Sequence, residues 1–229
     1  MIFVICGKKR TGKDTAAKIL NETGEFSSFA FADYIKYILE DAGKRCGVVA
    51  FSGFKYEKSF WQGDREKPLL TSNSEVYSLF RCAVDIMIER GIIDENLISN
   101  TDILQVVVLN TELWSIRRLM QVFGTDIVCR KDDSVWVKLA LSESFKHTPS
   151  ETGPKLSKHI LFTDCRQLHE YKYMQRLGAK FIFLEKETGE ADNHSTEQGL
   201  IPCPDDYIID NNGTLEQLKS NILNLIKSV

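Results

Sequence analysis

The sequence has no long apolar segment and no marked excess of charge of one sign. No run of residues is long enough to span a membrane, and the apolar stretch near the N-terminus is too short for a signal peptide. The net charge of −3 gives no general attraction to a polyanion. We therefore expect a soluble, cytoplasmic protein with neither a nucleic-acid polymer nor a membrane as its partner.

The sequence also lacks a cysteine motif. Its six cysteines are scattered, without a Cys-x-x-Cys pair and without zinc-ligand spacing from a histidine. Such cysteines are typical of free thiols in a reducing compartment. With 229 residues, 43% of them hydrophobic and 27% charged, the chain has an ordinary globular composition. Its length fits one α/β domain with an insertion, or two small domains.

Apolar periodicity predicts strands that alternate with helices. The predicted strands are 2–6, 26–31, 159–163, 180–185 and 207–210, and 103–109 is also β-rich. The predicted helices are 13–21, 33–45, 74–90, 112–123, 132–145, 166–177 and 214–227. Gly124-Thr-Asp126 ends the helix at 112–123, and Thr214 or Gly213 caps the last one. Residues 47–72, 146–158 and 186–205 are predicted to be irregular. This alternation predicts a parallel sheet with helices on both faces and ligands beyond the carboxyl ends of its strands.

One segment carries a phosphate-binding pattern. Gly7-Lys-Lys-Arg-Thr-Gly-Lys-Asp-Thr15 follows the first strand and opens the first helix, with the spacing Gly-x-x-x-x-Gly-Lys. Backbone N–H groups of such a loop point at an anion, and Lys13 would lie between the β- and γ-phosphates. Asp14 stands where Ser or Thr normally meets Mg²⁺, and a carboxylate also suits that hard cation. The segment predicts a site for a nucleoside triphosphate and its metal.

Transfer of a phosphoryl group needs positioning and positive charge more than covalent chemistry. Arg117 and Gln121 lie four residues apart on a predicted helix, opposite its apolar stripe, and should therefore face a cleft or solvent. The sequence supplies further cations, any of which could instead be a solvated surface charge: Lys9, Arg10, Lys36, Arg65, Arg118, Arg130 and Arg166.

Three other features have two interpretations each. Asp164 follows a strand, where it could hold magnesium-bound water or orient Arg166. It could instead simply cap the next helix. Glu170 could pair with Arg166 one turn later. His194 lies in a polar loop that is either a lid or an ordinary loop. The tryptophans either stack on a base or pack in the core: Trp61, Trp114 and Trp136. No Ser-His-Asp triad or metal cluster can be assembled.

Several segments together resemble the deoxynucleoside monophosphate kinases of tailed phages, particularly of the T-even kind, over essentially the full length. Asp14 is usual in that family, whereas Arg130 departs from the family's spacing. The matching segments are 7–15, 31–36, 64–66, 114–126, 136–139, 163–170, 194–200 and 212–218.

The resemblance implies an α/β P-loop kinase fold of three layers with a parallel central sheet. Residues 1–32 and 111–229 would form the core, with a lid-like loop at about 186–205, and 33–110 would form an inserted, mostly helical subdomain that binds the deoxynucleoside monophosphate. The implied reaction transfers the γ-phosphoryl group of ATP, with Mg²⁺, to a 2′-deoxynucleoside 5′-monophosphate for phage DNA precursor synthesis. The resemblance further suggests a homodimer in the host cytoplasm.

The resemblance also implies roles for individual residues. The catalytic set would be Lys13, Arg117, Asp164 and Arg166. The ATP-binding set would be Gly7, Arg10, Thr11, Gly12, Lys13, Asp14, Thr15 and Asn211, with Asp14 towards the metal and Asn211 near the adenine. The acceptor-binding set would be Lys9, Ile35, Lys36, Arg65, Arg117, Gln121, Gly124, Thr125, Trp136, Asp164, Arg166 and Glu170.

Two alternative functions stay open at this point. One is another small-molecule P-loop kinase, of the phosphomevalonate or dephospho-coenzyme A type. The other is a non-catalytic nucleotide-binding module, although mere binding needs fewer cations than this sequence supplies.

Overall fold

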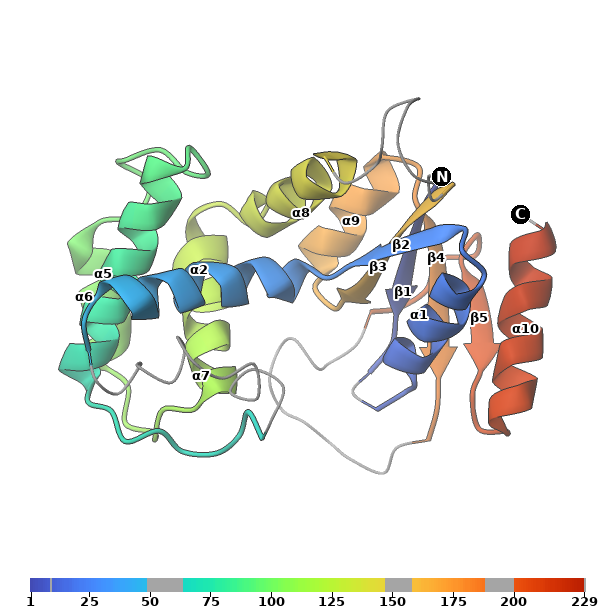
Figure 1. The fold of residues 1–229 in the computed structure, drawn as a ribbon, viewed down its shortest axis with the longest axis horizontal. Helices are drawn as coiled ribbons and strands as arrows, with labels where there is room; N and C mark the ends of the chain where they lie inside the picture. Colours follow the sequence, from blue (N-terminus) through green and yellow to red (C-terminus); the bar gives the residue numbers. More distant parts are fainter. Residues whose placement is uncertain (9, 49–63, 147–157, 188–199, 229) are drawn as a thin grey trace. The chain divides into compact units, whose positions relative to one another are not determined.

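The computed structural model describes residues 1–8, 10–48, 64–146, 158–187 and 200–228 (Figure 1). The chain divides into two compact units. The first contains Met1–Phe31 and Ala140–Val229, and the second contains Ala32–Leu139. In the described ranges, no helix is long and apolar enough to cross a membrane.

The first unit is built on a five-stranded parallel sheet with the order β2-β3-β1-β4-β5. β1 lies at its centre because Phe3 to Cys6 are apolar on both faces, and each is at most 1% exposed. Val4 of β1 is in register with Phe162 of β3 and with Phe181 of β4. The strands are β1 (Ile2–Cys6), β2 (Phe26–Phe29), β3 (His159–Cys165), β4 (Lys180–Glu185) and β5 (Tyr207–Asp210).

Helices cover both faces of this sheet: α1 (Lys13–Glu22), α9 (Leu168–Arg176) and α10 (Leu215–Ser228) (Figure 1). Ile182 and Leu184 of β4 join the apolar cluster that α1 and α10 complete. Phe181, which points the other way, packs against Tyr171 of α9 with 4.3 Å between ring centroids. The predicted three-layer α/β fold is confirmed.

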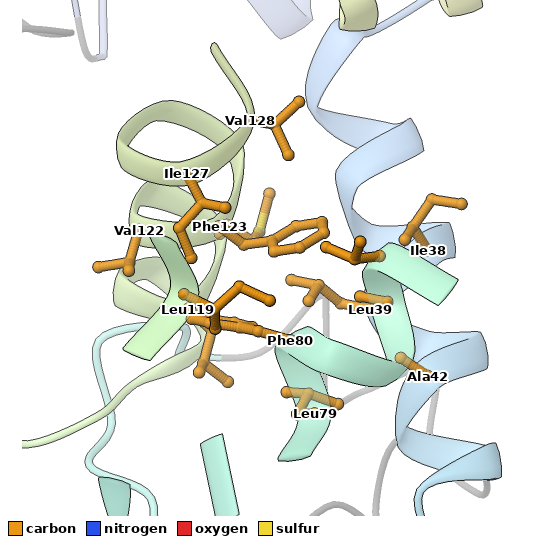
Figure 2. Close-up of a cluster of buried hydrophobic side chains, with 14 of the residues drawn as sticks. Ile38, Leu39, Ala42, Leu79, Phe80, Leu119, Val122, Phe123, Ile127 and Val128 are labelled. Carbon is orange, nitrogen blue, oxygen red and sulfur yellow. The ribbon is translucent and has the colours of Figure 1, made fainter. Parts of the chain in front are cut away.

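The second unit has an apolar core of its own. Among its described residues, the helices are α2 (Phe31–Arg45), α5 (Asn73–Glu89), α6 (Asn100–Val108), α7 (Ile116–Gln121), η2 (Val122–Cys129) and α8 (Val135–Lys146). Of these, α2 begins and α8 ends in the first unit. Figure 2 shows Leu39, Phe80, Leu119 and Phe123 pointing towards one another from α2, α5, α7 and η2. Each of these side chains is fully buried.

The prediction of a β-rich segment at 103–109 is wrong, because Ile103 to Val108 lie in α6. Ser99 and Asp102 form a reciprocal capping box that starts this helix. Ile103 and Val107, one turn apart, are buried, whereas Val108 is 62% exposed. Local capping and helical burial therefore outweigh the strand preference of the β-branched residues.

The prediction that Gly124-Thr-Asp126 ends a helix is also wrong. α7 continues directly into η2, a π-helix in which the N–H of Arg130 donates to the carbonyl of Thr125 five residues earlier. Gly124 serves close packing here, since a Cβ at this position would lie 2.6 Å from Cδ1 of Ile35. Its carbonyl also accepts a 3.0 Å hydrogen bond from Nε1 of Trp136.

The compact units divide the chain at a different place from the predicted domains. Residues 111–139 belong with 32–110, because α7, η2 and the first turn of α8 contribute to the core of the second unit. The assignment of an acceptor-binding role to the inserted part stays a prediction. Residues 49–63 and most of the predicted irregular segments at 146–158 and 186–205 lie outside the described residues.

Candidate functional site

The loop between β1 and α1 has a backbone that requires glycine at both ends of the pattern. Gly12, with φ +93°, precedes α1, and a Cβ there would lie 2.5 Å from Nδ2 of Asn211. A Cβ on Gly7 would lie 2.6 Å from Oγ1 of Thr11 and 2.8 Å from the carbonyl oxygen of Leu184. The loop is therefore closely fitted to the ends of β4 and β5.

Lys13 is the buried cation of this loop. Its side chain is 7% exposed, and Nζ donates hydrogen bonds of 2.7 Å and 2.6 Å to the carbonyl oxygens of Gly7 and Lys8. Oγ1 of Thr11 also donates to the Lys8 carbonyl, at 2.9 Å. Arg10 is exposed and adopts a positive φ of 63°. The loop thus presents the cations and backbone donors that a chain of phosphates requires.

Asn211, which the resemblance places near adenine, holds the loop from the end of β5. Its Nδ2 donates a 2.8 Å hydrogen bond to the carbonyl of Thr11, and its N–H donates to the carbonyl of Glu185 at 2.8 Å. The residue is buried. The structure therefore gives Asn211 a loop-supporting contact, and its contact with adenine stays a prediction.

Asp14 and Thr15 lie exposed in the first turn of α1, beside the loop. Carboxylate and hydroxyl oxygens suit a hard divalent cation. The described residues contain no group of three or more acidic, histidine or cysteine side chains that could hold a metal by themselves. A metal here would therefore take most of its ligands from phosphate and water, which is how Mg²⁺ is usually bound beside a nucleotide.

Asp164, at the end of β3, does not cap the helix that follows it, since Gln167 is the N-cap of α9. Its Oδ1 accepts a 2.8 Å hydrogen bond from the N–H of Phe31, the first residue of α2. The capping alternative is therefore wrong for α9, and Asp164 instead joins the end of β3 to the start of α2.

Glu170 is a buried carboxyl in the first turn of α9. Its Oε2 accepts hydrogen bonds from the N–H groups of Arg166, at 2.8 Å, and of Gln167, at 2.9 Å. Burial, and then the nearby charge of Asp164, raises the pKa of Glu170 to about 7, although these hydrogen bonds and the Arg166 charge oppose the shift. Glu170 thereby fixes the backbone from which the Arg166 side chain extends.

In the second unit, two segments of the resemblance lie side by side. The N–H of Arg117 donates to the carbonyl of Arg65 at 3.0 Å, and Nε of Arg117 lies 2.5 Å from Oε1 of Glu66. Pro68 and Ser115 form an antiparallel bridge next to this contact. The backbones of Arg65 and Arg117 are therefore adjacent, and the Arg117 side chain lies against Glu66.

A second group of predicted acceptor residues lies on α2, α7, η2 and the start of α8. Ile35 packs on Gly124, and Trp136, which is 3% exposed, donates to its carbonyl. Trp136 and the equally buried Trp114 are thus packed in the core. Nζ of Lys36 pairs with Oδ1 of Asp33 at 2.6 Å. Gln121 and Thr125 are half-buried on the same helical stretch.

The predicted site residues accordingly form two sets. The ATP-binding set, Asp164, Arg166 and Glu170 lie in the first unit, and the other described acceptor residues lie in the second. That both sets form one site stays a prediction. Lys9, Trp61 and His194 lie outside the described residues.

Sequence reasoning missed Glu66 as the partner of Arg117 and Phe31 as the partner of Asp164. The segment 64–66 did mark the neighbourhood of Glu66, but no spacing rule joins it to Arg117. Both contacts depend on tertiary structure.

Comparison with known proteins gives concordant matches. A protein-family model described as deoxynucleotide monophosphate kinase matches residues 1–222. The deoxynucleotide monophosphate kinase of Escherichia phage RB69 is 31% identical over 250 residues, covering 99% of this chain and 99% of that protein. The protein of the same name from Enterobacteria phage T4 is 29% identical over 252 residues, covering 99% of this chain and 98% of that protein.

Proposed function

The chain belongs to the deoxynucleotide monophosphate kinase family, and from that premise we propose that it transfers the γ-phosphoryl group of ATP to a 2′-deoxynucleoside 5′-monophosphate. The products are ADP and the deoxynucleoside diphosphate. The observation that carries the proposal is the loop between β1 and α1, with Lys13 buried against the carbonyls of Gly7 and Lys8.

The loop would bind the ATP phosphates through its backbone N–H groups and the N-terminus of α1. Nζ of Lys13 would exchange its carbonyl partners for phosphate oxygens, which carry more negative charge. Because this ammonium is already held at the loop, little reorganisation is needed when negative charge moves to the leaving group. Gly12 keeps the loop free of side chains where Asn211 supports it.

Asp14 and Thr15 would hold Mg²⁺, which is the metal we propose for this site because their oxygens and the phosphates suit it. The bound metal would neutralise charge on the transferred group. The expected result of Asp14→Ala is a higher Mg²⁺ concentration for half-maximal rate, whereas Asp14→Ser should keep Mg²⁺-dependent activity. A metal titration checks both variants, and an unchanged apparent affinity in Asp14→Ala would remove Asp14 from the metal site.

Arg117, Arg65 and Lys36 of the second unit, with Arg166 of the first and Lys9, would hold the acceptor phosphate. Glu66 would keep Arg117 oriented by its ion pair. Ile35, Gln121, Gly124, Thr125 and Trp136 would shape the pocket for the nucleoside. Asp164 and Glu170 would position the start of α2 and the backbone of Arg166.

The test is an assay of ADP release from ATP with each of the four natural deoxynucleoside monophosphates, beside a ribonucleotide. We expect release that depends on a deoxynucleotide. Release with phosphomevalonate or dephospho-coenzyme A alone would favour another small-molecule kinase. ATP binding without acceptor-dependent release would favour a non-catalytic module, and either result would overturn the proposal.

We further propose that the protein acts as a homodimer in the cytoplasm of an infected cell, where it would supply precursors of phage DNA. Both relatives named above come from phages, which supports this setting. Sedimentation equilibrium of the purified protein checks the dimer, and a monomeric mass across the tested concentrations would contradict it.

A further inference from the structure

The second unit contains a cavity of about 460 Å³ beside α6, α7 and η2. Its apolar wall is formed by Val106 of α6, by Leu109 just after α6, and by Val122 at the start of η2. Figure 2 shows Val122 on the side of its helix that points away from Phe123. The volume lies within the usual range for small-molecule sites.

Arg118 supplies a positioned guanidinium at this cavity. Its Nε donates a 2.7 Å hydrogen bond to Oδ1 of Asn110, and Nη1 lies 2.9 Å from Oε2 of Glu112. The guanidinium carbon also lies 5.8 Å from the ring centroid of Trp114. These contacts hold the planar group in place while other N–H groups of the guanidinium can still bond a ligand.

Arg130, which follows η2, supplies a second cation to the same cavity. It is exposed, and within the described part of the chain its side chain forms no ion pair. Thr125 and Asp126 complete the lining with a hydroxyl and a carboxylate. The cavity therefore combines an apolar wall, two arginines and oxygen atoms that can accept N–H or O–H groups.

This cavity is distinct from the predicted acceptor site. Of the acceptor residues, Thr125 alone among those described lines it. Gly124 packs instead against Ile35, and Arg117 pairs with Glu66. The proposed transfer of a phosphoryl group gives Arg118 and Arg130 no task.

We infer that the cavity is a second ligand site, which binds a nucleoside phosphate. The ring would lie on Val106, Leu109 and Val122, and the phosphate would bond Arg118 and Arg130, whose planar forks match phosphate oxygens. Asp126 would accept an N–H or O–H group of the base or sugar. Inorganic phosphate would bond the two arginines but leave the apolar wall exposed to water, so it should bind more weakly than the nucleoside phosphate.

Methyl NMR of the full chain tests this inference, with thymidine monophosphate, ADP and inorganic phosphate as probes. Methyl signals of Val106, Leu109 and Val122 report on the cavity. The methyl signal of Thr11, whose side chain lies beside Gly7 and bonds the Lys8 carbonyl, reports on the loop. In the wild type we expect saturable shifts at the cavity with a nucleotide and weaker ones with inorganic phosphate. Arg130→Glu should raise the apparent Kd for these shifts about tenfold or more, because it removes a charge-assisted hydrogen bond and adds repulsion.

Lys219→Glu, which makes the same charge change on an exposed residue of α10, is the matched control and should leave the cavity shifts unchanged. Arg130→Glu should keep the turnover and the loop shifts of the wild type.

Cavity shifts that persist undiminished in Arg130→Glu would mean that the shifts report a distant rearrangement, and this result would overturn the inference. So would an absence of saturable shifts, or shifts that follow protein concentration without nucleotide, since a second copy would then cover this face. If the wild type binds nucleotide at the cavity but shows no acceptor-dependent release of ADP, the result would instead count against the proposed function.

Discussion

Lys13 is a buried charge whose hydrogen-bond acceptors belong to its own loop. The carbonyl oxygens of Gly7 and Lys8 accept hydrogen bonds from its Nζ, and the side chain is buried. An ammonium buried without acceptors would carry a large desolvation cost. The loop therefore holds its cation in place before any nucleotide binds, which is the condition for strong electrostatic catalysis.

Lys13→Ala should lower turnover about 100-fold or more, which is the usual loss when one positioned electrostatic group is removed. The melting temperature should change little, because Lys8 and Gly7 are not fully buried and water can reach their freed carbonyls. Steady-state kinetics and thermal melting check both expectations. Lys18→Ala, on the exposed side of α1, is the control and should match the wild type. Wild-type turnover in Lys13→Ala would refute the loop assignment.

Arg117→Ala should lower kcat about 1,000-fold, because a cation on the transferred phosphoryl group can be worth that much. The matched control is Arg45→Ala, which breaks an exposed ion pair with Glu89 in the same unit and should change kcat by less than about threefold. Single-turnover kinetics separate the transfer step from nucleotide binding. A loss of only a few fold in Arg117→Ala would reduce Arg117 to a surface charge.

At the scale of residues, separation along the chain decided what could be predicted. The pattern Gly-x-x-x-x-Gly-Lys lies within one short segment, so spacing alone predicted a loop there, but not its support by Asn211, which donates to Thr11 across 200 residues. Asp164 accepts from Phe31 across 133 residues, and no local pattern shows that pair. The same holds for Arg117 and Glu66, whose contact needs the strand-like bridge between their segments.

At the scale of elements, the strands of the sheet were predictable because they are short apolar runs with turn residues around them. α6 was not, since its run of β-branched residues suggests a strand and only the Ser99–Asp102 capping box indicates a helix. The continuation of α7 into η2 was also not predicted. Gly124 is typical of a helix end in sequence, but in the structure it leaves the space that the Ile35 side chain occupies.

Gly124→Ala tests this packing between α2 and η2. The new methyl group would meet Cδ1 of Ile35 and should lower the free energy of unfolding by about 1–3 kcal/mol. Ile35→Val removes that Cδ1 atom, so the double variant should be less destabilised than the sum of the two single variants. Urea unfolding measures all three. Simple additivity would contradict the contact between Gly124 and Ile35.

At the scale of the whole molecule, alternation of strands and helices predicted the fold class, but not where the two units divide. The structure shows that helical segments both before and after residue 110 enter the core around Phe80 and Phe123. A sequence pattern tells which face of a helix is buried. It does not tell which core receives that face.

Stability should depend on pH through Glu170. Its pKa rises from 4.5 when unfolded to about 7 when folded, so the folded state binds more protons between these values. Stability is then greatest below pH 4.5 and falls as the pH rises through 7, by about 3 kcal/mol at most for this group. The Glu170→Gln variant has no carboxyl group at this position, so its stability should lack this pH dependence. The free energy of unfolding of the variant minus that of the wild type should therefore increase as the pH rises from 4.5 to 7.

Urea midpoints of wild type and Glu170→Gln between about pH 4.5 and 8 give the difference curve that isolates Glu170 from other titrating groups. Glu95→Gln, at an exposed position, is the control and should give a flat difference. A flat difference for Glu170→Gln as well would show that Glu170 ionises in the folded state as it does in the unfolded chain.

An assay that follows a labelled γ-phosphoryl group tests the central claim most directly. The claim is that the loop from Gly7 to Thr15 binds ATP for transfer of its γ-phosphoryl group to a deoxynucleoside monophosphate. With γ-labelled ATP and a deoxynucleoside monophosphate, the wild type should place the label in the deoxynucleoside diphosphate, and Lys13→Ala should scarcely do so. Label that remains in ATP, or that appears only as inorganic phosphate, would contradict the account.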